Sequence, residues 1–130
     1  CWLGVVDIDH FKRINDNYGH SVGDEALREV AGVLKASLRN IDMVFRYGGE
    51  EFLVLLSNTS SEVAAMVGER LRQAVHNLQV VFQGQALQMS ISLGCATLQA
   101  GESVDGLQQR ADQALYQAKR NGRNRLNLAS

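Results

Sequence analysis

Apolar residues recur along the chain with two spacings, one typical of strands and one typical of helices. Short apolar runs predict strands over residues 2–8, 43–47, 52–56, 78–82, 87–98 and 125–128. Apolar residues three and four positions apart predict helices over residues 9–20 and 22–39, from Ser60 or Ser61 to Val75, and from Val104 to near Gly122. The expected order of elements is therefore β-α-α-β-β-α-β-β-α-β.

Two glycine turns decide how the expected strands pair. Gly48-Gly49 and Gly84 each separate two apolar runs, which predicts two antiparallel hairpins. Hairpins and helices in this order predict an α+β fold, a ferredoxin-like sandwich in which helices flank a mixed, largely antiparallel sheet. The chain has 130 residues and neither a repeat nor a linker, so we expect one domain spanning residues 1–130.

Composition and charge exclude several classes of protein. The 13 basic and 14 acidic residues give a net charge of −1, which offers no overall electrostatic reason to bind nucleic acid. No apolar run approaches the roughly 18 residues that a membrane span needs, so we expect no membrane contact. Cys1 and Cys95 lack the spacing of a zinc site. The chain opens with Cys1 and Trp2 inside a strand pattern rather than with Met, so we expect an N-terminally truncated piece of a longer protein.

Four carboxylates are the first candidates for chemistry. Asp7 and Asp9 lie at the end of the first expected strand, and Glu50 and Glu51 lie at the tip of the central hairpin. If the first strand pairs beside that hairpin, Asp7 and Glu50 converge and favour a hard cation such as Mg²⁺. In the alternative interpretation, Asp7 caps the following helix and the two glutamates are solvated turn residues.

Basic residues near both ends of the chain could hold phosphate groups. Lys12 lies in the first turn of a helix, whose free backbone N–H groups attract anions. The stretch KRNGRNR, residues 119–125, places a cluster of basic residues at the end of the last helix. In the alternative interpretation, those charges complement the helix dipole. The sequence contains no P-loop motif, so phosphate binding would depend on other donors.

Four separated blocks, taken in order, closely resemble the GGDEF family, the diguanylate cyclases. The blocks are DIDHFKRINDNYGHSVGDEAL, RNIDMVFRYGGEEF, SISLG and ADQALYQAKRNGRN, and the resemblance runs from Trp2 to about Leu128. The signature stands here as GGEEF, residues 48–52, with glutamate in the third position. The resemblance implies a sandwich of the nucleotidyl-cyclase type and condensation of two GTP molecules into cyclic di-GMP and two pyrophosphates.

The resemblance also implies which residues carry this reaction. It implies that Mg²⁺ or Mn²⁺ is bound by Asp7, the carbonyl of Ile8 and Glu50, and that catalysis rests on Glu50 as general base and on Lys12. Glu51 is expected to support metal or substrate binding. The residues expected to bind GTP are Asn15 and Asp24 as the guanine-reading pair, His20 near the nucleoside, Gly48 and Gly49 at the close approach of the backbone, and Lys119 and Arg123 at the phosphates.

A second constellation resembles the inhibitory RxxD site of the family, where the product binds. Arg39 and Asp42 match this motif, and Arg70 is a possible further contact. The plainer alternative is an arginine that ends a helix and an aspartate in a turn. The resemblance further implies a homodimer with two-fold symmetry and a cytoplasmic domain, the output of a sensor that could itself be membrane-anchored.

Two other classes of function compete with the enzyme. A non-catalytic domain that binds cyclic di-GMP or GTP would keep the fold and the RxxD site but make no product. The presence of Asp7, Glu50, Glu51, Asn15 and Asp24 favours activity over that alternative. A ferredoxin-like interaction module would leave the polar residues at the ends of the blocks unexplained.

Overall fold

The first strand lies at the centre of the main sheet. In the computed structural model, which describes residues 1–129, β1 (Trp2–Ile8) pairs antiparallel with both β3 (Glu51–Leu56) and β6 (Ile91–Thr97). β2 (Met43–Arg46) extends the sheet antiparallel to β3, and β7 (Leu126–Leu128) extends it parallel to β6. The order β2-β3-β1-β6-β7 confirms the predicted mixed, mostly antiparallel sheet.

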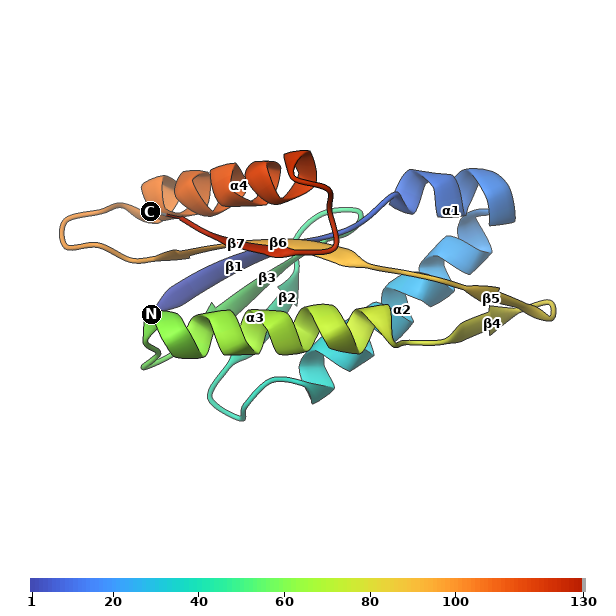
Figure 1. The fold of residues 1–130 in the computed structure, drawn as a ribbon, viewed down its shortest axis with the longest axis horizontal. Helices are drawn as coiled ribbons and strands as arrows, with labels where there is room; N and C mark the ends of the chain where they lie inside the picture. The colour runs from blue at the N-terminus through green and yellow to red at the C-terminus, as the bar shows by residue number, and fades with distance from the viewer. Residues whose placement is uncertain (130) are drawn as a thin grey trace.

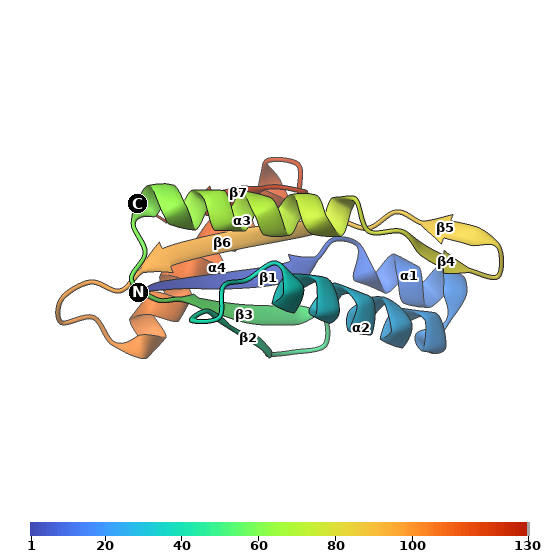
Figure 2. The same ribbon diagram turned by 90° about the horizontal axis from the view of Figure 1, so that it is seen from below.

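Helices cover both faces of this sheet (Figures 1 and 2). α2 (His20–Ala36) and α3 (Ser61–His76) lie on one face, and α4 (Val104–Arg120) lies on the other, as Figure 1 shows. Even-numbered β1 residues such as Val6 and Ile8 join the larger core cluster, whereas the odd-numbered Leu3 and Val5 pack with α4 residues. Because side chains alternate along a strand, Asp7 belongs to the face that α4 covers.

The expected strand over residues 87–98 is wrong, because the chain forms two strands there. β5 (Gln85–Leu87) pairs with β4 (Val80–Phe82) in a separate two-stranded sheet, and β6 begins only at Ile91. Figure 1 shows this hairpin projecting beyond the main sheet on the side of α1 (Phe11–Tyr18). Side-chain hydrogen bonds hold the residues between the two strands. The Gln88 amide donates to the His76 carbonyl, and the Ser90 hydroxyl donates to Asp9.

The second expected helix also ends earlier than the apolar spacing predicts. α2 stops at Ala36, because Arg39 bonds to Asp42 and to the Thr59 hydroxyl instead of continuing the helix. At its start, Gly19 separates α1 from α2 with a φ of 91°, a value that favours glycine. None of the helices in the described part of the chain is long and apolar enough to cross a bilayer.

Candidate active site

Strand pairing brings Asp7 to the base of the central hairpin. Asp7 is the register partner of Glu51 on one side and of Ser92 on the other. The backbone N–H of Ile8 donates to the carbonyl of Glu50 over 3.2 Å, which fixes the last residue of β1 against the hairpin loop. The expectation that the first strand pairs beside this hairpin is therefore confirmed.

The Asp7 carboxylate is buried, and only one of its two oxygens has a partner. Its side chain exposes 8% of its surface and forms an ion pair with Lys119 Nζ in the last turn of α4. Its other oxygen, Oδ1, is buried and is the only such side-chain atom within residues 1–129 that lacks a hydrogen-bond partner. Leaving a buried charged acceptor unsatisfied costs about 1–3 kcal/mol or more, so this oxygen favours a cation as its partner.

The alternative role of Asp7 as a helix cap is wrong. The residue before α1 is His10, in a left-handed conformation, and no side chain caps this helix. The second part of that alternative, a solvated Glu51, is also wrong, because Glu51 is half-buried in β3.

Negative charge accumulates around Asp7. Burial, followed by the charges of Asp7 and Asp112, raises the pKa of Glu51, although Lys119 opposes the shift. Burial also raises the pKa of Asp112 on α4. Burial thus disfavours the charged forms of Glu51 and Asp112, and a cation bound at this corner would relieve that cost.

The donors at this corner fit a hard cation. Across residues 1–129, no three His, Cys, Asp or Glu side chains are grouped closely enough to hold a metal by themselves. The predicted set instead combines two carboxylates, Asp7 and Glu50, with the carbonyl of Ile8, and within this set Asp7 Oδ1 is buried without a hydrogen-bond partner. Oxygen donors with room for water and phosphate are typical of Mg²⁺ sites.

Asp9 has a different role from Asp7. Its carboxylate accepts hydrogen bonds from the Ser90 and Ser92 hydroxyls, each over 2.6 Å, and from the backbone N–H of Asn124 over 2.9 Å. These bonds join the end of β1 to β6 and to the loop that follows α4. Asp9 therefore holds the neighbouring elements in place, and both of its oxygens are occupied.

The basic residues expected at the phosphates lie on two elements. Lys119 lies in the last turn of α4, and Arg123 follows in a turn where Gly122, Arg123 and Asn124 all have positive φ values of 124°, 62° and 48°. Arg72 of α3 donates to the Asn124 side chain over 3.0 Å, which braces this turn from the other side. Lys12 is exposed in the first turn of α1.

The expected guanine-reading residues lie on α1 and α2, which pack against each other, but only Asp24 of them lines the cavity beside α2. Asn15 is half-buried on α1, and its amide lies against Gly23 of α2. Asp24, the next residue, is exposed and lines a cavity of about 490 Å³ between α2 and the β2–β3 hairpin. His20 is exposed at the first position of α2, one turn before Asp24.

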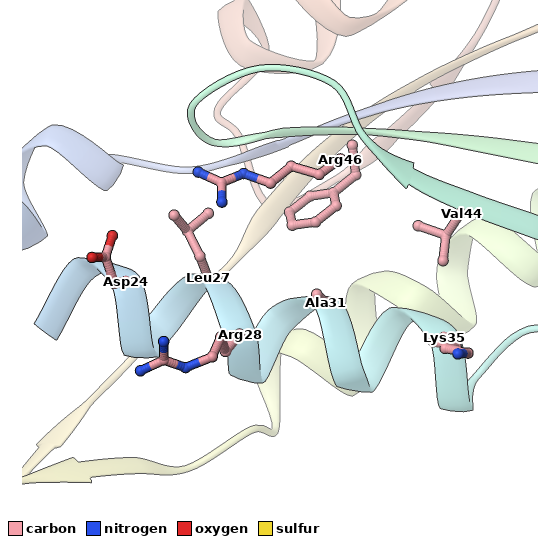
Figure 3. A pocket seen from close by; sticks show the side chains of 8 residues that line it. Asp24, Leu27, Arg28, Ala31, Lys35, Val44 and Arg46 are labelled. Carbon is pink, nitrogen blue, oxygen red and sulfur yellow. The ribbon is translucent and has the colours of Figure 1, made fainter. Parts of the chain in front are cut away.

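The cavity has an apolar floor and charged edges. Figure 3 shows Asp24 and Arg28 near the N-terminal end of α2, Lys35 near its other end, and Arg46 extending from the hairpin toward Asp24. The apolar lining is formed by Leu27, Ala31, Val44 and Phe52. A flat apolar ring with a polar edge, such as a nucleobase, matches this lining.

Sequence reasoning missed Arg46, which closes the hairpin loop. Its guanidinium donates to the carbonyls of Gly48, over 3.2 Å, and Gly49, over 2.9 Å. Neither glycine has a positive φ, and a Cβ on Gly49 would meet no atom within 4 Å. Gly49 therefore leaves open space next to Glu50 in the chain, and the position of Arg46 two residues before the glycines is the only signal that could have indicated its role.

Arg39 and Asp42 form a closed pair. Arg39 donates to both Asp42 oxygens over 2.8 Å, and it also reaches the Ser57 carbonyl and the Thr59 hydroxyl. These hydrogen bonds lower the pKa of Asp42, whose side chain exposes no surface, whereas the Arg39 side chain exposes 34%. Arg39 is thus the member of the pair that a ligand can reach; Arg70 lies exposed on α3.

Comparison with known proteins agrees with this geometry. The chain matches the family described as "Diguanylate cyclase, GGDEF domain" over residues 2–125. It is 46% identical over 126 residues to diguanylate cyclase A of Treponema denticola, which covers 96% of this chain and 34% of that protein. The chain thus spans about a third of the length of this relative.

Solved structures share the fold over almost the whole chain. The GGDEF domain of DgcB from Caulobacter crescentus, solved in complex with c-di-GMP, has a TM-score of 0.93 and 37% identity, covering 98% of this chain and 76% of that one. The active GGEEF domain of a diguanylate cyclase from Vibrio cholerae has a TM-score of 0.90 and 36% identity, covering 99% and 82%. The chain therefore belongs to the GGDEF domain family, the family of the diguanylate cyclases.

Proposed function

We propose that this chain is the catalytic domain of a diguanylate cyclase. It would condense two GTP molecules into cyclic di-GMP and release two pyrophosphates. In each half of the reaction, a 3′-oxygen forms a bond to an α-phosphorus while the bond from that phosphorus to the bridging oxygen of the leaving pyrophosphate breaks. The relatives that share the fold include enzymes named for this activity.

One observation carries the proposal. Asp7 has a buried Oδ1 without a hydrogen-bond partner, and its other oxygen is paired with the Lys119 ammonium. Asp7 is also the register partner of Glu51, the residue next to Glu50. Burying a charged oxygen without a partner costs free energy, and a bound cation would remove that cost. Diguanylate cyclases of this family generally use divalent metals, and we propose Mg²⁺, or Mn²⁺ in its place, held by Asp7, Glu50 and the Ile8 carbonyl.

The residues of the chain would divide the remaining work. When bound, the metal ion neutralises charge on the phosphates and orients them. Glu50 would accept the proton of the attacking 3′-hydroxyl, since the open space at Gly49 lets substrate approach it. Lys12, Lys119 and Arg123 would hold the triphosphate from both sides.

Guanine would be selected at the junction of α1 and α2. A carboxylate such as Asp24 accepts from the N1–H and amino group of guanine, whereas adenine offers no donor at the position of N1. Asn15 supplies a second polar contact, and His20 lies one turn away from Asp24 at the start of α2. The apolar floor of the neighbouring cavity offers a surface on which a ring can pack.

Two copies of the domain would act together. Each product contains two guanylyl units joined by two equivalent bonds, so two GTP-loaded sites must face each other across a two-fold axis. Because the proposed substrate is an intracellular nucleotide, we also place the domain in the cytoplasm, as the sequence predicts.

Chromatography of the reaction products tests this proposal. The full chain, incubated with GTP and Mg²⁺, should yield cyclic di-GMP and two pyrophosphates per molecule of product. Glu50→Gln should lose at least about a hundredfold in rate, since general-base catalysis contributes roughly that much. Glu29→Gln, an exposed position on α2, serves as the control and should keep the parent rate.

Two outcomes would contradict the proposal. An unchanged rate in Glu50→Gln would remove the assigned base. If the parent binds GTP or cyclic di-GMP but forms no product at any protein concentration, the domain is a nucleotide receptor rather than an enzyme.

We also propose that the product inhibits the enzyme at Arg39. The pair with Asp42 would hold the guanidinium in a fixed orientation, so that its exposed part can bind a guanine edge or a phosphate of cyclic di-GMP. Arg70 on α3 would add a further contact. Titration of cyclic di-GMP into the parent and into Arg39→Ala tests this, and equal affinities would remove the site.

A further inference from the structure

Gly23 occupies a position on α2 where no side chain fits without moving Asn15. A Cβ placed on Gly23 would lie 1.9 Å from Asn15 Oδ1, 3.0 Å from Asn15 Cγ and 3.3 Å from the Phe11 ring. All three atoms belong to side chains of α1, and Gly23 itself is buried. The contact between the two helices at this point is therefore a contact between a bare Cα and the Asn15 amide.

Backbone conformation does not explain this glycine. Gly23 is the fourth residue of α2, and its φ is not among the positive values found elsewhere in the chain. Glycine is a poor helix former, and alanine would favour the helix at this position. Gly32, in the same helix, would place a Cβ in open space. Substituting alanine at Gly32 therefore changes helix propensity alone, whereas alanine at Gly23 also disturbs the Asn15 contact.

We propose that Gly23 is a positioning residue for guanine selectivity, because it leaves the space in which the Asn15 amide is held. This inference rests on the proposed function, in which Asn15 and the adjacent Asp24 read the base. Within residues 1–129, the Asn15 side chain makes no hydrogen bond, and its amide lies directly against Gly23.

An alanine at position 23 would displace the Asn15 side-chain amide and leave the backbone fold unchanged. The closest atom, Asn15 Oδ1, is the end of a side chain that can rotate, and the three nearest atoms all belong to side chains. Asp24 would keep its place on α2, because its backbone is unchanged. The expected result is a folded chain in which only half of the base-reading pair is in position.

Equilibrium binding of GTP and ATP to the full chain tests the inference. Gly23→Ala should bind GTP about tenfold more weakly, the usual effect of losing one polar contact, and should bind ATP as the parent does. Gly32→Ala should keep the preference of the parent for GTP. Because Gly23 acts through Asn15, the double variant Asn15→Ala/Gly23→Ala should bind GTP no more weakly than Asn15→Ala alone.

A nucleotide-free measurement isolates the geometric part of the inference. In ¹⁵N-correlated NMR spectra, the side-chain amide signals of Asn15 should shift in Gly23→Ala and stay in place in Gly32→Ala. Unchanged Asn15 signals, or an unchanged GTP preference in Gly23→Ala, would overturn the inference while leaving the proposed function intact. If the parent shows no preference for GTP over ATP, the proposed function fails and this inference fails with it.

Discussion

Two aspartates that lie two residues apart show how environment decides the role of a residue. Asp9 accepts three hydrogen bonds from Ser90, Ser92 and Asn124, whereas Asp7 keeps one buried oxygen without a partner. The sequence predicts a metal ligand at Asp7, and it gives no role to Asp9. Their difference depends on residues more than 80 positions away, which become neighbours only when β6 pairs with β1.

The Arg39–Asp42 pair provides a prediction at the scale of residues. Asp42→Asn should lower the free energy of unfolding by about 1 kcal/mol at neutral pH, because the buried Asp42 side chain would lose the charge that accepts the Arg39 hydrogen bonds. Urea unfolding of parent and variant measures this difference. Asp16→Asn, at an exposed position on α1, is the control and should change stability little.

The same pair also predicts a pH dependence. Hydrogen bonds from Arg39 lower the pKa of Asp42 in the folded state, so the pair stabilises the fold above the ordinary aspartate range. This contribution is lost as the pH falls through the lowered pKa of Asp42. The stability difference between parent and Asp42→Asn should therefore shrink on acidification, and a difference that grows would contradict the assignment.

At the scale of elements, the position of α4 depends on one glycine in β6. A Cβ on Gly94 would lie 2.1 Å from the backbone nitrogen of Leu115 and 2.2 Å from the carbonyl oxygen of Ala111. The helix therefore packs directly on the strand backbone, and this close approach places Lys119 beside Asp7. A glycine inside a strand pattern is a known signal of close backbone approach, but the sequence does not show which element approaches.

Gly94→Ala tests this packing. Because the obstructing atoms belong to backbone, α4 must move away, and we expect a loss of about 3 kcal/mol or more in the free energy of unfolding. Gly32→Ala, in open space on α2, should instead be neutral or stabilising by up to about 1 kcal/mol. Thermal unfolding of both variants measures the contrast, and equal stabilities would show that α4 does not rest on Gly94.

Most elements follow from apolar spacing, and the exceptions have physical causes. The spacing predicts the four helices, because each buries one face, and the two glycines between apolar runs predict the central hairpin. It does not predict the break between β5 and β6, because Leu87, Met89 and Ile91 continue the apolar pattern through the point where the chain leaves one sheet for the other. The end of α2 is likewise set by the distant hydrogen bonds of Arg39.

At the scale of the whole molecule, the proposed reaction needs more than one copy of the chain. A single copy presents one cavity beside Asp24 and one corner at Asp7. The sequence predicts the residues of this half-site through their resemblance to a family, whereas spacing alone predicts only that carboxylates and basic residues lie at the ends of elements. The apolar pattern that predicts the core of one copy does not determine how two copies are arranged.

This requirement predicts how the rate depends on protein concentration. In dilute solution, the rate of product formation per copy should rise in proportion to concentration, because two GTP-loaded copies must meet, and should level off once dimers form. Initial rates measured alongside sedimentation analysis test this. A constant rate per copy at concentrations where the chain sediments as a monomer would contradict it.

The most direct test of the account is the binding of a divalent ion at Asp7 and Glu50. Electron paramagnetic resonance can follow free Mn²⁺ during titration of the full chain in the presence of a GTP analogue that cannot react. We predict that Asp7→Asn and Glu50→Gln each weaken Mn²⁺ binding at least tenfold, while Asp105→Asn, at an exposed position in the first turn of α4, leaves it unchanged. Equal Mn²⁺ affinity in all four proteins would contradict the account.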